Sequence, residues 1–131
     1  RNPWRFATDY ILTGDKAVFK HLQLLNKWIR KETHNIPLDI KPGYYIAGSD
    51  KAVPGEPIPG RDYRAISFIA PFAVSAMIEE KNQEWLNKLW KTIIADIYDE
   101  GLPFDKDLYY GNTMRMLIMI IVSGNWWAPV P

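Results

Sequence analysis

The chain has 131 residues, of which 47% are hydrophobic and 24% charged, a balance typical of a globular domain rather than a disordered or collagen-like chain. Sixteen Lys and Arg against fifteen Asp and Glu give a formal net charge of +1, which argues against nucleic acid as a partner. Cysteine is absent, which excludes disulfides, zinc–thiolate sites and thiol nucleophiles. Aromatic residues are abundant, with six Trp, seven Tyr and five Phe, and clefts that bind ligands are one place where such rings gather.

The start of the chain and its most apolar stretch indicate whether it is part of a longer protein and whether it crosses a membrane. The sequence opens at Arg1 with neither Met nor a signal-peptide pattern, so we expect a piece of a longer protein. The longest strongly apolar run, 114–122, is well short of the roughly 20 residues that cross a bilayer. We therefore predict a buried helix there and no membrane partner.

The first two predicted helices form a hairpin with almost no loop between them. Asn2 is the expected cap of the first helix, Pro3 its first residue and Gly14 its end. Asp15 then caps the second helix, which runs to about residue 31 with an apolar stripe at helical spacing. The two helices are predicted to pack antiparallel.

Residues 33–60 are rich in Pro and Gly and predict a long inserted loop. Connections of this length are more often functional or disordered than accidental. Both alternatives stay open on the sequence alone. The adjacent Tyr44 and Tyr45, with prolines that lower the entropy lost on ordering, favour an ordered loop that forms a site.

Three further helices are predicted in the second half of the chain. The first runs from Pro71 to about residue 80. The second follows the cap residue Asn82 and ends near residue 100, and the third runs from near Asp107 to about residue 123. The last is apolar nearly all round, which predicts an interior helix with neighbours on several sides. Half-exposed and interior helices thus alternate, so the fold class is all-α with the layering of a two-ring helical toroid. The interior helix implies partner helices outside this chain.

Carboxylates are the main catalytic resource of the sequence. His21 and His34 have no second ligand at useful spacing, so no metal and no cofactor are expected. The sequence has neither a phosphate-binding Gly-rich loop nor a nucleophile-elbow motif. Glu56 lies between prolines in the PGEPIPG segment at 54–60, where the stiff backbone can aim its side chain.

Aromatic pairs at the ends of segments are a second resource, because sugar rings stack on aromatic faces while their hydroxyls bond to polar groups. These pairs are Tyr44–Tyr45, Tyr109–Tyr110 and Trp126–Trp127. For the tyrosines, packing and ligand binding are equally open. Tryptophans at helical spacing are instead expected to pack the core, and they are Trp28, Trp85 and Trp90.

Three strings in this order resemble the C-terminal part of glycoside hydrolase family 8. They are RNPWRFATDY at 1–10 with GD at 14–15, FIAPFAVSAM at 68–77, and YY at 109–110 with SGNWW at 123–127. The resemblance implies a bacterial, secreted, endo-acting hydrolase of β-1,4-linked glucan, mixed-linkage glucan, xylan or chitosan. It also implies an (α/α)6 barrel in which residues 1–131 form the C-terminal part of one catalytic domain and supply roughly its last five helices, with 33–60 as an inserted loop.

The same resemblance implies an inverting mechanism with two carboxyl groups. The general acid of the family lies on an early helix, outside this chain. The base is either an Asp three residues before the position of Arg1, or a Glu on the inserted loop, and the long loop here favours Glu56. Other alignments of the loop leave Glu32, Asp50 and Asp62 as alternatives.

The resemblance assigns further residues to the substrate, which is a polysaccharide. Arg1 is expected to pair with a carboxylate or a sugar hydroxyl beside the cleaved bond. Tyr109 and Tyr110 are expected to line the cleft, and Tyr44 and Tyr45 are weaker candidates for stacking. Trp126 and Trp127 are expected to hold the C-terminal tail across the barrel. The expected partner is the missing N-terminal part of the same barrel, and the fragment alone is expected to be inactive. The alternative is a non-catalytic α-helical module that binds carbohydrate or protein.

Overall fold

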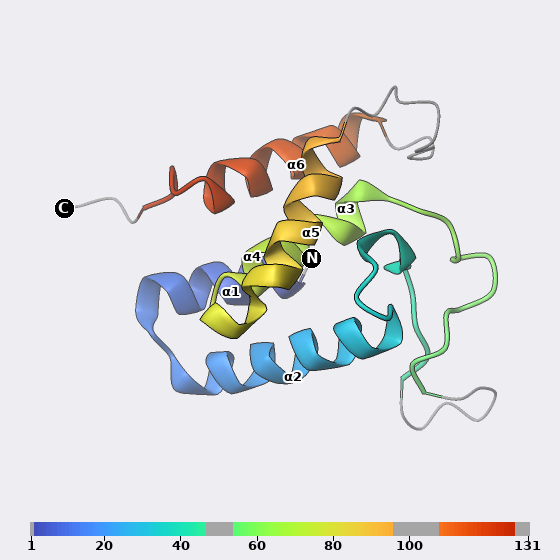
Figure 1. The fold of residues 1–131 in the computed structure, drawn as a ribbon, viewed down its shortest axis with the longest axis horizontal. Helices are drawn as coiled ribbons and strands as arrows, with labels where there is room; N and C mark the ends of the chain where they lie inside the picture. The colour runs from blue at the N-terminus through green and yellow to red at the C-terminus, as the bar shows by residue number, and fades with distance from the viewer. Residues whose placement is uncertain (1, 47–53, 96–107, 128–131) are drawn as a thin grey trace.

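The computed structural model describes residues 2–46, 54–95 and 108–127, which form helices joined by turns and one long loop (Figure 1). The helices are α1 (Asn2–Thr13), α2 (Lys16–Glu32), α3 (Ile66–Ile69), α4 (Pro71–Ala76), α5 (Gln83–Ile94) and α6 (Leu108–Val122), with short 3₁₀ turns η1 (Pro37–Asp39) and η2 (Glu80–Asn82). Within this described part, the one β-type pairing is an isolated antiparallel bridge between Tyr44 and Pro57. The predicted all-α class is confirmed.

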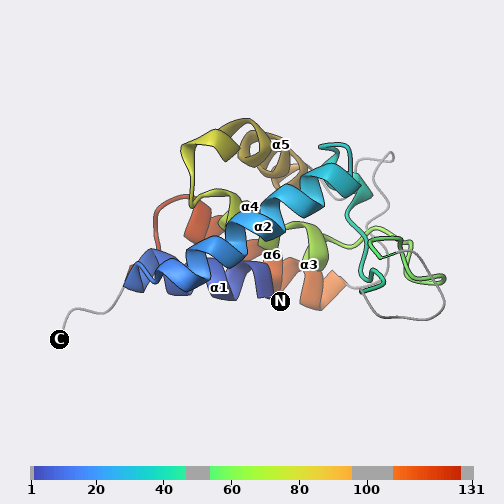
Figure 2. The ribbon, with the colours of Figure 1, turned by 90° about the horizontal axis from the view of Figure 1, so that it is seen from below.

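The helices form two layers, as the alternation of interior and half-exposed helices predicts. Helices α1, α3–α4 and α6 run in the same direction, and α4 contacts both α1 and α6 (Figure 1). Figure 2 shows α2 and α5 on the same side of this layer, where α2 contacts α1 and α4, and α5 contacts α4. All six residues of α4 are buried between its neighbours. The N-terminal ends of the parallel helices therefore face one end of the molecule.

The helical hairpin forms largely as predicted. Gly14 takes a positive φ of 70° that reverses the chain. Oδ1 of Asp15 then accepts hydrogen bonds from the backbone N–H groups of Ala17 (2.7 Å) and Val18 (3.1 Å), which caps α2. One detail is wrong: Asn2 is the first residue of α1 rather than its cap.

The predicted helix over 71–80 is instead two short helices that begin earlier and end earlier. Helical structure starts at Ile66, and Ala70, which joins α3 to α4, also has helical dihedral angles. Pro71 has no N–H to donate, so it interrupts the hydrogen-bond ladder and divides the segment. The segment ends at Ala76, and Glu79 is extended.

The helix predicted over 83–100 ends at Ile94. Ala95 has an extended conformation, and its carbonyl accepts a hydrogen bond from Nη2 of Arg115 at 2.9 Å. The end of the helix and this contact with α6 therefore coincide at Ala95. Asn82 precedes α5 but its side chain makes no cap hydrogen bond. Residues 96–107 lie outside the described part.

Helix α6 is buried on one side rather than all round. Met114, Ile118 and Ile121 are buried, whereas Met116 is 60% and Ile120 38% exposed. Neighbours in the described part cover only one face of α6, as expected if the helices that would surround its other face lie outside this chain. No helix in the described ranges has the length and apolar character to cross a membrane.

Candidate active site

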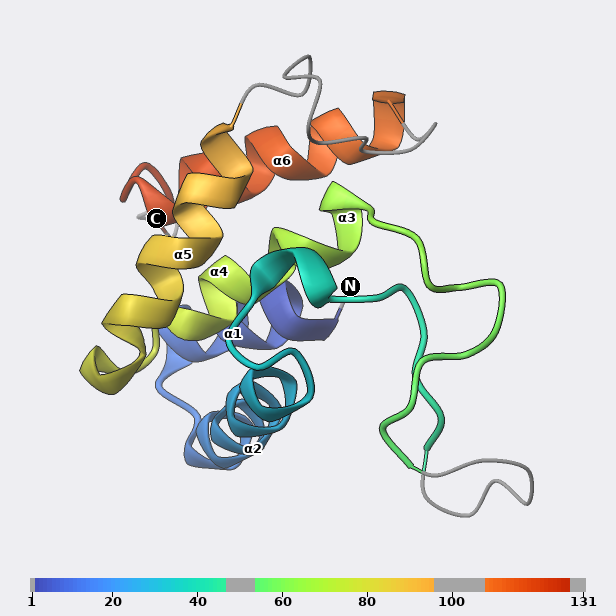
Figure 3. The same cartoon turned by 45° about the vertical axis from the view of Figure 1, so that its right-hand side comes forward.

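The two arms of the inserted loop pair with each other beside the helical layer (Figure 3). The N–H of Tyr45 donates to the carbonyl of Glu56 and the N–H of Gly55 donates to the carbonyl of Tyr45, both at 2.9 Å. The N–H of Ile58 donates to the carbonyl of Gly43 at 3.1 Å. These bonds favour the ordered-loop alternative for residues 33–46 and 54–60.

The tip of the second arm packs on the end of α2. Gly55 has φ of 96°, and a Cβ built on it would lie 3.2 Å from Oε2 of Glu32. The Glu32 carboxylate therefore lies against the turn that carries Glu56. Glu32 and Glu56, two of the candidates for the base, are therefore near each other in the structure. The Glu56 side chain is exposed and Glu32 is half-buried.

A cavity of about 270 Å³ opens where the loop meets the start of α1. It takes its lining from α1, α2, the first loop arm, α3 and α4: Asn2, Pro3, Trp28, Lys41, Pro42, Tyr44, Phe68, Pro71 and Phe72. Aromatic rings and polar groups are therefore both available to a ligand. This combination suits the apolar faces and hydroxyl edges of a sugar.

Tyr44 is held firmly in the wall of this cavity. Its hydroxyl accepts a hydrogen bond from the N–H of Lys41 (2.8 Å), and its ring meets Trp28 edge to face with centroids 4.9 Å apart. Burial raises the pKa of the Tyr44 phenol, and the Glu32 and Asp39 carboxylates act in the same direction, while the Lys41 hydrogen bond opposes them. The phenol is thus kept neutral, and the ring is presented rigidly.

The tyrosine pair at the start of α6 lies at the same end of the molecule, above α3 (Figure 3). Tyr109 is 89% exposed and Tyr110 is half-buried. Gly111 lets this end of α6 approach α3 closely, since a Cβ there would come within 2.9 Å of Cγ2 of Ile66. Among the described residues predicted for the site, Tyr44 alone lines the cavity; Tyr45 and Glu56 lie on the paired loop arms, and Tyr109 and Tyr110 lie at the start of α6.

Several predicted residues are placed elsewhere or fall outside the described ranges. Arg1 and Asp50 lie outside them, although Asn2, the neighbour of Arg1, lines the cavity. Asp62 is exposed on the chain that returns from the loop. Trp126 and Trp127 are 38% and 71% exposed in this chain.

Of the nine residues that line the cavity, sequence reasoning assigned only Tyr44 to a ligand, and Trp28, Lys41 and Phe68 are among those that it missed. Trp28 was expected only in the core, because its spacing matches the apolar stripe of α2, yet it packs on the core and also lines the cavity. Lys41 stands three residues before Tyr44, and Phe68 is 37% exposed just before the helix that was predicted to begin at Pro71. The exposure of Phe68 is a property of the folded chain, so no spacing in the sequence identified it. The described residues include no group of three His, Cys, Asp or Glu that could hold a metal ion.

An aromatic cavity with neighbouring loop carboxylates, at the N-terminal ends of parallel helices, has the features of a carbohydrate cleft. Comparison with known proteins shows a similarity to glucanases. The chain is 39% identical over 128 residues, 98% of its length, to a β-glucanase of Niallia circulans. It is 28% identical over 131 residues to an endoglucanase of Bacillus sp. strain KSM-330. No family model matches the chain.

A solved glucanase structure is also similar to this chain in its fold. The apo structure of a β-1,3-1,4-glucanase from Paenibacillus sp. X4 matches 97% of the chain with a TM-score of 0.76 and 31% identity. The chain spans only about a quarter of the length of these relatives, between 24% and 29%. The resemblance to glucanases predicted from the three strings is therefore confirmed.

Proposed function

We propose that this chain is the C-terminal part of the catalytic domain of a secreted bacterial endo-glucanase of glycoside hydrolase family 8. The observation that carries the proposal is the 39% identity to the Niallia circulans β-glucanase along 98% of the chain. The layer of parallel helices fits an arc of an (α/α)6 barrel, and the rest of that barrel is the main protein partner. No cofactor takes part.

The reaction proposed is inverting hydrolysis of a β-1,4-linked polysaccharide. A carboxylic acid on the N-terminal part protonates the leaving oxygen, and a carboxylate on this chain removes a proton from the attacking water. Glu56 is the proposed base. Its backbone is fixed by the hydrogen bond from Tyr45, and prolines on both sides limit its freedom. Its side chain remains exposed, as a group that activates solvent requires.

The remaining site residues hold the sugar chain. Arg1 is proposed to bind a carboxylate or a sugar hydroxyl through its planar guanidinium. Tyr109 and Tyr110 line the cleft from α6, and Tyr44 and Tyr45 line it from the loop. The rigid setting of the Tyr44 ring against Trp28 supports its role as a stacking platform.

The names of the relatives favour a β-glucan as the substrate, and the β-1,3-1,4-glucanase of Paenibacillus sp. X4 points to a mixed-linkage glucan such as lichenan. Chitosan is the second candidate. The acidic residues of the loop region slightly outnumber its basic ones, which would suit a cationic polymer. Turnover on lichenan, carboxymethylcellulose, xylan and chitosan by the full-length enzyme separates these substrates. A non-catalytic carbohydrate- or protein-binding module would hydrolyse none of them.

The base is tested by Glu56→Gln in the full-length enzyme, with Glu80→Gln as the matched control because Glu80 is exposed at the start of η2. Loss of a general base should reduce kcat on the order of 10²-fold or more, whereas the control keeps its activity. Turnover of Glu56→Gln close to that of the unmodified enzyme, with an unchanged circular dichroism spectrum, would exclude this assignment. Glu32→Gln then tests the neighbouring carboxylate.

Two further measurements test the mechanism and the division of the domain. Proton NMR of the first products should show the α-anomer, because inversion at a β-linkage produces it. Initial formation of the β-anomer would refute inversion. The 131-residue chain alone should release no reducing sugar from lichenan or chitosan, because the proposed general acid is on the other part of the barrel. Measurable release would contradict that division.

A further inference from the structure

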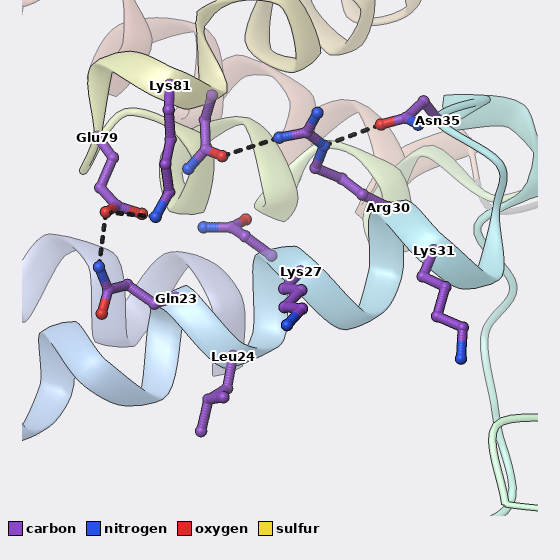
Figure 4. A pocket seen from close by; sticks show the side chains of 10 residues that line it. Gln23, Leu24, Lys27, Arg30, Lys31, Asn35, Glu79 and Lys81 are labelled. Carbon is purple, nitrogen blue, oxygen red and sulfur yellow. Dashed lines mark hydrogen bonds and ion pairs between the residues drawn. The ribbon is translucent and has the colours of Figure 1, made fainter.

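A second cavity, of about 410 Å³, lies between α2 and the turn that leads into α5 (Figure 4). Its lining is strongly polar and consists of Gln23, Leu24, Asn26, Lys27, Arg30, Lys31, Asn35, Glu79, Lys81 and Asn82. It shares no lining residue with the cavity of the candidate active site. The proposed hydrolysis gives it no role.

Arg30 is the central feature of this cavity. Its Nε donates to Oδ1 of Asn35 at 2.8 Å and its Nη1 donates to Oδ1 of Asn82 at 3.2 Å (Figure 4). Both partners are neutral amides, and across the described ranges the half-buried guanidinium makes no ion pair. An arginine keeps its charge at all ordinary pH values. The cavity therefore holds an oriented cation that lacks a counter-charge.

Asn82 adds a donor with no partner. Only 2% of this residue is exposed, and its Oδ1 already accepts from Arg30. Its Nδ2 is buried and has no hydrogen-bond partner within residues 2–46, 54–95 and 108–127. Since buried donors are nearly always satisfied, an unpaired one in a cavity wall points to a missing acceptor. Asn82 and Arg30 would both be satisfied by oxygen atoms of one ligand.

The other charged groups of the cavity are one carboxylate and three lysines. Glu79 pairs with Lys81 at 2.9 Å and accepts from Gln23 at 2.6 Å through Oε1, while its Oε2 is buried without a hydrogen-bond partner among the described residues. Figure 4 shows Glu79 and Arg30 on different sides of the cavity. Lys27 and Lys31 are exposed on α2, one on each side of Arg30 in sequence. Their positive field would attract an anion toward the guanidinium.

We propose that Arg30 and Asn82 form a binding site for an oxyanion, either free phosphate or sulfate or the phosphate group of a larger solute. The open guanidinium donors and Nδ2 of Asn82 would bind oxygen atoms of the anion, and Lys27 and Lys31 would balance its charge. Guanidinium–oxyanion hydrogen bonds are among the stronger ones in proteins, because both partners are charged.

The test is isothermal titration of the full-length protein with inorganic phosphate, sulfate and glucose 6-phosphate, at constant ionic strength set with chloride. Saturable binding of phosphate or sulfate is expected. Tighter binding of glucose 6-phosphate would identify a larger solute as the source, and equal binding would identify the free anion. Cellobiose serves as a neutral probe and should not compete. Competition by cellobiose would overturn the proposal, since it would assign the cavity to uncharged sugar.

Two substitutions connect the binding to these residues. Arg30→Gln should weaken phosphate binding roughly tenfold or more, as expected for loss of hydrogen bonds to a charged group. Lys91→Gln is the control, because Lys91 is exposed on α5, and it should leave the affinity for phosphate unchanged. Equal weakening by both variants would show only a general charge effect and would overturn the site.

Asn82→Asp keeps the test decisive if Arg30→Gln fails to fold. A carboxylate at position 82 can pair with Arg30 in place of the ligand, so the variant should stay folded and yet lose phosphate binding. Retained binding by the folded Asn82→Asp variant would overturn the proposal. So would the absence of saturable binding to the unmodified protein by phosphate, sulfate and glucose 6-phosphate alike.

Discussion

The contact between α2 and α4 depends on one buried polar pair, and its removal has a calculable effect. Nδ2 of Asn26 donates to the carbonyl of Ser75 at 2.7 Å, and Oγ of Ser75 donates to Oδ1 of Asn26 at 3.0 Å. Asn26 is 2% exposed and Ser75 is fully buried. Both side chains are thus largely withdrawn from water, although Asn26 also lines the second cavity.

The expected losses follow from the number of polar atoms left unpaired, each of which costs about 1–3 kcal/mol. Ser75→Ala removes one bond and leaves Oδ1 of Asn26 without its donor, so the free energy of unfolding should fall by about 1–2 kcal/mol. Asn26→Leu removes the partner of both the carbonyl and the Oγ of Ser75, so the free energy of unfolding should fall by about 2–4 kcal/mol. The double variant leaves only the carbonyl, and should recover about 1 kcal/mol relative to Asn26→Leu.

Urea denaturation of the four proteins, followed by circular dichroism, measures these differences as a double-mutant cycle. Asn87→Ala is the control, because Asn87 is exposed on α5 and its loss should change stability by less than about 0.5 kcal/mol. Strictly additive effects of the two single substitutions would refute the reasoning. They would mean that the two side chains do not depend on each other in the folded protein.

Three further substitutions have predicted effects on the free energy of unfolding in urea. Gly55→Ala should destabilise the loop by about 1–3 kcal/mol, because φ is positive and the new Cβ meets the Glu32 carboxylate; an unchanged midpoint would contradict this. The pKa of Tyr44 is raised, so the stabilisation that the neutral phenol provides is present below the ordinary pKa of 10.0 and is lost as the pH rises through the folded-state pKa. Tyr44→Phe should therefore flatten the alkaline loss of stability. Burial acts to raise the pKa of Glu79, but its hydrogen bonds to Lys81 and Gln23 outweigh burial and leave that pKa lowered. The stabilisation that the Glu79 carboxylate provides is present above the ordinary pKa of 4.5 and is lost as the pH falls through the folded-state pKa. Glu79→Gln should therefore reduce the loss of stability in acid. An unchanged dependence of the free energy of unfolding on acid pH would contradict this.

Features set by neighbouring residues were predictable from the sequence. The Gly14 turn and the Asp15 cap need only a positive φ and a short acceptor side chain, and both are present as expected. The apolar segment that became α4 is also buried as its composition predicts, whereas the two-ring layering of a toroid stays a prediction. Local rules were sufficient for these elements.

Features set by distant contacts were not predictable. The end of α5 coincides with a hydrogen bond to the carbonyl of Ala95 from Arg115, which lies 20 positions further along the chain. The amide of Asn82 was expected to cap α5, but it accepts from Arg30, 52 positions away. The approach of Glu32 to Gly55 depends on closure of the inserted loop. In each case a tertiary partner competes successfully with a local one, and no spacing in the sequence identifies that partner.

The two edges of the helical layer connect the structure to the proposed barrel. Helices α1 and α6 each contact α4, and each leaves large apolar side chains exposed, such as Leu12 (47%) on α1 and Met116 (60%) on α6. Apolar faces at both edges of a layer favour continuation of that layer by further helices rather than contact with water. An arc cut from a closed ring would leave this pattern, with its N-terminal helix ends gathered around part of a cleft. The proposed acid and the proposed base would then come from separate arcs and meet across the ring.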